Sequence, residues 1–137
     1  MAVRERFPAL EKYRAALLAH WEGVCAALEE VWARLPAHRR ERASSIIAEL
    51  LEFERAEVLP SLAKLLGRPI ALPERGGLDG YCALRASEIA VTRALTPEEW
   101  SLQERHPRFG IRTTQWWVER SLIAAKAALE QLRTIVG

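Results

Sequence analysis

The sequence predicts an all-α fold, a four-helix bundle, chiefly from two stripes of apolar residues. In each stripe the spacing alternates between four and three, which places the side chains on one face of a helix. The first stripe lies near the N-terminus and consists of Leu17, Trp21, Val24, Leu28, Val31 and Leu35. The second lies at the C-terminus and consists of Val118, Leu122, Ala125, Leu129, Leu132 and Val136. A third observation supports the same class, because no segment shows the alternating pattern of a half-buried strand.

Prolines and a glycine bound the first two predicted helices. Helix one is expected to begin at Pro8, whose fixed φ suits a first helical position, and to end before Pro36. Helix two is expected over residues 40–66, with Gly67 as a left-handed cap. Pro60 lies inside this helix and lacks a backbone N–H, so we expect a local kink or restart there.

The connection between helices two and three is predicted to be long. Residues 68–77 are rich in proline and glycine and form a loop longer than a simple helix hairpin needs. Helix three is expected over residues 78–95. A connection of this length argues against a simple up-down-up-down bundle.

A short extra helix is predicted before the last helix. Thr96 and Glu99 have the spacing of a capping box, and this helix is expected to run to about Gln103. Gly110 provides a permissive φ for the turn that follows, and Thr113 is expected to cap the last helix.

Composition excludes several classes of protein. With 137 residues we expect one domain over residues 1–137. The 20 basic and 18 acidic side chains are interleaved, which does not favour nucleic-acid binding. The longest apolar run, residues 15–19, is too short to cross a bilayer, and the charged N-terminus lacks a signal-peptide core. A cytoplasmic protein without a membrane partner is expected. Cys25 and Cys82 show no metal or redox spacing and are interpreted as ordinary buried thiols.

Two polar residues fall on or beside the predicted apolar faces. Glu54 lies four residues after Leu50 on the stripe of helix two, so its carboxylate should point into the bundle and need a partner. The favoured interpretation is an ion pair with Arg85 or Arg120, and the alternative is a catalytic or ligand-binding acid. His20 precedes the stripe residue Trp21 and is expected to face inward as a hydrogen-bonded core residue, or alternatively as a ligand.

Several motifs, taken in order, resemble the DinB/YfiT-like family. They are IIAELLEFE at residues 46–54, Leu84-Arg85, LTPEEW at residues 95–100 and HPRFG at residues 106–110, followed by the helix after Thr113. This resemblance implies a four-helix bundle of DinB/YfiT-like type, often dimeric. It also implies a divalent metal held by one histidine of helix two and two histidines, spaced HxxxH, of the last helix. Members include thiol-dependent S-transferases and related metal enzymes.

The three implied metal positions carry no histidine in this sequence. They fall on Glu49, Ala124 and Ala128, and a methyl group cannot bind a metal. The resemblance therefore supplies a fold, while the substitutions argue against its usual chemistry.

Three functions are left open. The first is a metal-free, non-catalytic DinB-like protein without a cofactor that acts as a binding or structural homo-oligomer, with a homodimer expected. The second is a metal-dependent enzyme, of thiol S-transferase or hydrolase type, with a site rebuilt from histidine and glutamate side chains. The third is a pocket for an unknown apolar small molecule, with Trp21, Trp116 and Trp117 as walls. The candidate pocket residues are His20, Glu52, Glu54, Trp117 and Ser121.

Overall fold

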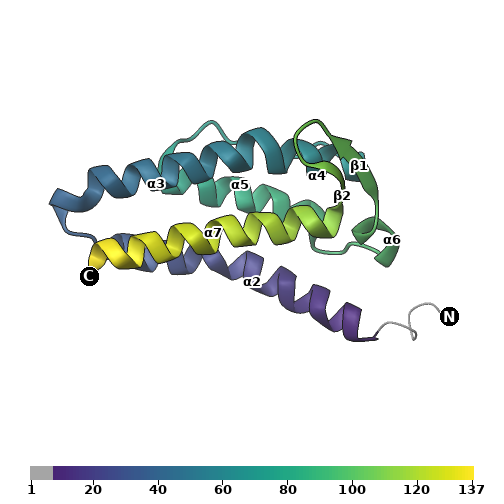
Figure 1. Cartoon of the computed structure of the whole chain (residues 1–137), viewed down its shortest axis with the longest axis horizontal. Helices are drawn as coiled ribbons and strands as arrows, with labels where there is room; N and C mark the ends of the chain where they lie inside the picture. The colour runs from purple at the N-terminus through teal and green to yellow at the C-terminus, as the bar shows by residue number, and fades with distance from the viewer. Residues whose placement is uncertain (1–7) are drawn as a thin grey trace.

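The computed structural model describes residues 8–137 and is mostly helical, with one small antiparallel sheet (Figure 1). The elements, in chain order, are α2 (Pro8–Ala33), the 3-10 turn η1 (Ala37–Arg39), α3 (Arg40–Phe53), the π-helical segment η2 (Glu54–Val58), α4 (Leu59–Leu66), α5 (Gly77–Thr92), α6 (Pro97–Trp100), β1 (Gln103–His106), β2 (Gly110–Thr113) and α7 (Thr114–Val136). Within the described residues, no helix combines the length and the apolar composition needed to cross a bilayer.

The long helical segments lie side by side but do not alternate in direction (Figure 1). The purple α2 and the yellow-green α7 run one way, whereas the segment from α3 to α4 and then α5 run the other way. The loop between α4 and α5 therefore returns along the length of the molecule, as its predicted length requires. The order is not up-down-up-down.

Helix two is interrupted directly before its proline. The five residues of η2 form a π-helix, in which the N–H of Leu59 bonds to the carbonyl of Glu54, five residues back. Pro60 follows and has no N–H for the helical ladder, which explains why the regular pattern gives way here. The predicted local disturbance is confirmed. The helix then ends at Gly67 with φ 61°, the left-handed cap that was expected.

A β-hairpin replaces the predicted end of the short helix. Helix α6 ends at Trp100 rather than near residue 103, and Gln103 pairs with Thr113 at the open end of the hairpin. At its closed end His106 pairs with Gly110, whose φ of 76° lets a three-residue turn join the strands. The capping box of Thr96 is confirmed. The cap of α7 is also confirmed, because the N–H of Trp116 donates to the side chain of Thr113 at 3.0 Å.

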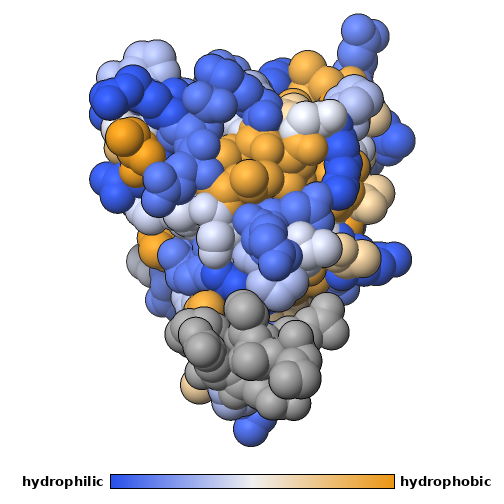
Figure 2. Space-filling model, turned by 90° about the vertical axis from the view of Figure 1, so that its right-hand side faces the viewer, coloured by the Kyte–Doolittle hydropathy of each residue, from blue (hydrophilic) through white to orange (hydrophobic). Residues whose placement is uncertain are grey.

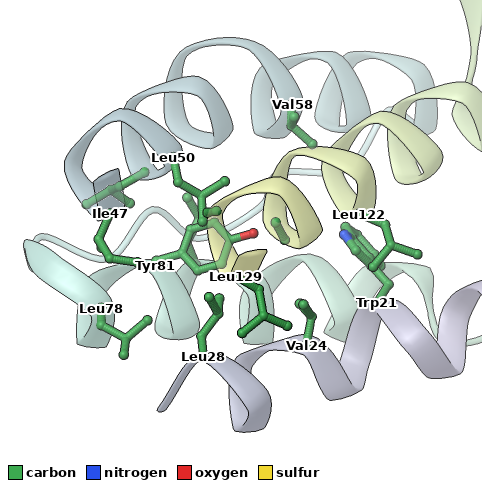
Figure 3. Packing of buried hydrophobic residues seen from close by; sticks show 14 of the residues in the cluster. Trp21, Val24, Leu28, Ile47, Leu50, Val58, Leu78, Tyr81, Leu122 and Leu129 are labelled. Atoms are coloured by element: carbon green, nitrogen blue, oxygen red, sulfur yellow. The ribbon is translucent and has the colours of Figure 1, made fainter. Parts of the chain in front are cut away.

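The two predicted apolar stripes face a common core (Figure 3). The buried residues of α2 belong to the predicted stripe, and its last member, Leu35, is buried just beyond the helix. Helix α7 buries its predicted stripe except for Val136 at its end, which is half-buried. Between them pack Ile47 and Leu50 of α3 and Tyr81 of α5. Each Å² of apolar surface removed from water stabilises the fold by about 25 cal/mol, so this core is the main source of stability.

Candidate functional site

A fully buried cluster of polar side chains lies inside the apolar core. Its members come from four helical segments, and each is at most 2% exposed: Trp21, Glu54, Tyr81, Arg85, Glu88 and Ser121. Buried charges are costly unless they are paired and hydrogen-bonded. The contacts of this cluster therefore decide whether it stabilises the fold or serves a reaction.

Arg85 is the centre of the cluster. Its Nε donates to Glu88 Oε1 at 3.1 Å, and its Nη1 donates to the backbone carbonyl of Trp21 at 2.9 Å. Its Nη2 donates to the hydroxyls of Tyr81 and Ser121 at 2.6 and 2.7 Å, and lies 3.4 Å from Glu54 Oε2. The guanidinium also lies over the Trp21 ring, 4.6 Å from its centroid. The whole guanidinium is thus surrounded by acceptors and aromatic faces.

Ser121 uses its entire hydrogen-bonding capacity. Its hydroxyl accepts from Trp21 Nε1 at 2.8 Å and from Arg85, and it donates to Glu54, whose two carboxylate oxygens both lie at 2.8 Å. A serine hydroxyl has one proton and two lone pairs, so nothing remains for a substrate. This residue ties α2, η2, α5 and α7 together.

The expected ion pair of Glu54 is confirmed, and its partner is Arg85. Arg120, the other candidate, is exposed and lies over the ring of Phe53 instead. The π-helical segment begins at Glu54, which places the carboxylate inside the core.

Glu88, like Tyr81, is a member of the cluster that the sequence analysis did not single out. Its Oε1 accepts from Arg85, whereas its Oε2 is buried and has no partner among the described residues. Burial raises the pKa of Glu88 well above its ordinary value of 4.5, and the negative charge of Glu54 raises it further. The neutral acid is thereby favoured, which leaves the guanidinium and the Glu54 carboxylate as the charged pair.

The raised pKa of Glu88 predicts a fall in stability as pH rises. The folded protein holds this proton more tightly than the unfolded chain does, so its contribution is complete below pH 4.5 and is lost as pH rises through the raised pKa. We expect the substitution Glu88→Gln, which stays neutral, to flatten the pH dependence of the urea-unfolding free energy above the ordinary carboxyl pKa of 4.5. The exposed Glu52→Gln is the control and should keep the parent's slope; equal slopes in parent and Glu88→Gln would contradict the protonated state.

The three positions that the family resemblance assigns to metal ligands lie close together. Glu49 of α3 and Ala124 and Ala128 of α7 line one shallow, open depression of about 230 Å³. The rest of its lining is mainly apolar and consists of Ile46, Leu50, Phe53, Ala127 and Gln131. The site offers one exposed carboxylate and two methyl groups, which do not fit a divalent metal.

The other predicted pocket residues do not form one site. His20 is exposed, so the expectation that it faces inward is wrong. One residue along a helix turns the side chain by about 100°, and this is enough to take His20 off the face of Trp21. Glu52 is also exposed, on α3. Within residues 8–137, no group of three or more histidine, cysteine, aspartate or glutamate side chains has the arrangement of a metal site.

Trp117 packs in an aromatic cluster that attaches the hairpin to the helices. Its ring centroid is 5.3 Å from His106 and 5.6 Å from Phe109. His106 Nε2 donates to Glu57 of η2 at 2.8 Å, because its Nδ1 accepts the backbone N–H of Arg108 at 3.0 Å. Both ring nitrogens are engaged, so this histidine serves the attachment of the hairpin.

The end of the molecule that carries α6 and the hairpin exposes apolar surface with hydrophilic residues around it (Figure 2). A depression of about 330 Å³ lies at this end between α2, α5 and α6. Its lining mixes Leu18, Leu95 and Trp100 with Arg14 and Arg93 and offers no histidine or cysteine. The lining contains no nucleophile paired with a base.

Comparison of the chain with protein-family models, with curated proteins and with solved structures finds no match. The likeness to the DinB/YfiT-like family therefore rests on the order of motifs in the sequence. It stays a prediction.

Proposed function

We propose that this chain is a four-helix-bundle protein of DinB/YfiT-like type that does not use the metal of that family and acts as a binding or structural homodimer in the cytoplasm. The observation that carries the proposal is the makeup of the depression around Glu49, Ala124 and Ala128. The helix directions and the long connection between α4 and α5 support the proposed type of bundle.

The buried cluster supports a non-catalytic role. Its one guanidinium bonds to both carboxyl groups, and each of these side chains is at most 2% exposed, which leaves no open face for a substrate. A catalytic acid or base must come within hydrogen-bond reach of its substrate. We assign the cluster to fixing how the four helical segments pack.

The contact between two copies is proposed to use the exposed face of α7. Ile123 is 57% exposed, and its neighbours on this face, Ala124 and Ala127, are small. Small side chains let helices approach closely, and an exposed apolar face on a small protein marks an interaction surface. Glu49 and Gln131 at the edge of the depression provide a polar rim.

Two isoleucines of similar exposure test this contact. Ile123 lies on the proposed face, whereas Ile111, 54% exposed, lies on β2 in the hairpin. Light scattering after gel filtration at about 10 µM should give a dimer for the parent and for Ile111→Glu, and a monomer for Ile123→Glu, because a buried unpaired charge costs several kcal/mol.

Either of two results would contradict the proposal. A monomeric parent would exclude the homodimer. A dimer that Ile111→Glu disrupts and Ile123→Glu leaves intact would move the contact to the hairpin end shown in Figure 2.

A further inference from the structure

The two cysteines of the chain are neighbours in the fold. Cys25 lies in α2 and Cys82 in α5, and the two thiols lie close enough for each to shift the pKa of the other. Both are half-buried, so each keeps an accessible side. Helix packing thus brings together two residues that sequence spacing separates.

The register of α2 against α5 supports this pairing independently of the sulfur atoms. Two contacts fix how the helices lie along their common axis. Arg85 of α5 donates to the carbonyl of Trp21 of α2, and, further along, Glu29 of α2 and Leu78 of α5 line the same surface depression. Residue numbers rise along α2 as they fall along α5, so the helices are antiparallel. Cys25 lies one turn after Trp21, and Cys82 lies one turn before Arg85, which places both between these two contacts.

The surroundings give the two thiols different reactivity. The interaction with Cys82 lowers the pKa of Cys25, and the positive charge of Arg85 lowers it further, whereas burial opposes both. The same interaction raises the pKa of Cys82 and burial adds to it, while the charge of Arg85 opposes both. Because the thiolate is the reactive form, the lower pKa favours Cys25 as the attacking group and Cys82 as the resolving one.

We propose that Cys25 and Cys82 form a redox-active dithiol that hydroperoxides convert to a disulfide between α2 and α5. In the first step the Cys25 thiolate attacks a peroxide oxygen and the O–O bond breaks, which gives Cys25 sulfenic acid and an alcohol or water. In the second step the Cys82 thiolate attacks Cys25 Sγ and displaces hydroxide, which leaves as water after taking a proton. Two thiols lose two protons and two electrons, and the peroxide is reduced to alcohol and water.

A surface depression offers an approach for the oxidant and for a reducing thiol. It measures about 470 Å³ and is lined by Glu29 and Trp32 of α2 and by residues at the start of α5. Glu29 lies one turn beyond Cys25 on the same helix. The depression therefore lies about one helical turn from Cys25, and Arg85 is not part of its lining.

Intact-mass spectrometry of the reduced full chain treated with hydrogen peroxide tests the proposal. The parent should lose about 2 Da, lose both maleimide-reactive thiols and yield one cross-linked peptide that contains Cys25 and Cys82; a reductant should restore it. Cys82→Ser should stop at a sulfenic acid on Cys25 that a 1,3-diketone traps. Cys25→Ser should react about tenfold more slowly. The parent unfolded in urea should form the cross-link at least about tenfold more slowly than the folded protein.

Three results would overturn the proposal. They are a treated parent that keeps two alkylatable thiols, a parent that gains oxygen on each cysteine without a cross-link, and disulfide-linked pairs of chains on a non-reducing gel. Equal peroxide reactivity of the two single variants would overturn the assigned roles.

Discussion

Replacing Arg85 with methionine is expected to lower the free energy of unfolding by about 3–5 kcal/mol. The substitution leaves the Glu54 carboxylate buried without its cation and removes the donor to the Trp21 carbonyl and to Glu88. The side chain is 2% exposed, so water cannot replace the lost contacts. Urea unfolding at neutral pH, followed by circular dichroism, measures the change.

A second variant separates charge burial from packing. Removing the carboxylate as well, in Glu54→Leu/Arg85→Met, should recover part of the loss, because two apolar side chains can replace a buried ion pair at little net cost. The control is Arg93→Met, whose arginine lies at the surface 3.8 Å from Glu22 and should contribute less than about 1 kcal/mol. An Arg85→Met protein within about 1 kcal/mol of the parent would show that the cluster does not hold the helices together.

Gly80→Ala is the second substitution with a large expected effect. A Cβ at Gly80 would lie 2.0 Å from the carbonyl oxygen of Arg75, a backbone atom of the long connection. The clash cannot be relieved by a change of rotamer, so the loop and α5 must separate, at an expected cost of about 3 kcal/mol. The separation also disturbs the hydrogen bond from Arg55 to the same carbonyl, now 3.1 Å long.

A matched glycine provides the control. Gly23 lies in the exposed middle of α2, and a Cβ there meets nothing within 4 Å. Gly23→Ala should therefore raise the unfolding free energy by about 0.5–1 kcal/mol through better helix propensity. Thermal melts of the two variants should shift in opposite directions, and a Gly80→Ala protein as stable as the parent would show that the loop does not cross α5 so closely.

The helices and the ion pair of Glu54 were predictable because they follow the helical period. The two apolar stripes mark the buried faces of α2 and α7. Glu54 falls on the apolar stripe of helix two, so its burial and its need for an arginine follow from spacing alone. Glu88 lies on the apolar face of α5, three residues after Arg85. A carboxylate at this spacing on an apolar face would also have been identified as buried.

The hairpin could not be read from the sequence for a physical reason. β1 consists of Gln103 to His106 and contains no apolar residue, so it shows no alternating pattern. It is held by pairing with β2 and by the contact of His106 with Glu57, both of which depend on the tertiary fold. The meeting of Cys25 with Cys82 escaped prediction similarly, because it requires the direction and the register of α2 against α5.

Metal content is the most direct test of the central claim that the depression around Glu49, Ala124 and Ala128 does not hold a metal. We expect plasma mass spectrometry of untagged protein to find less than about 0.1 zinc, nickel or manganese per chain, and thermal melts to be unchanged by each added ion. About one metal ion per chain, or a melting temperature that rises with one of these ions, would contradict this account and point to a metal enzyme.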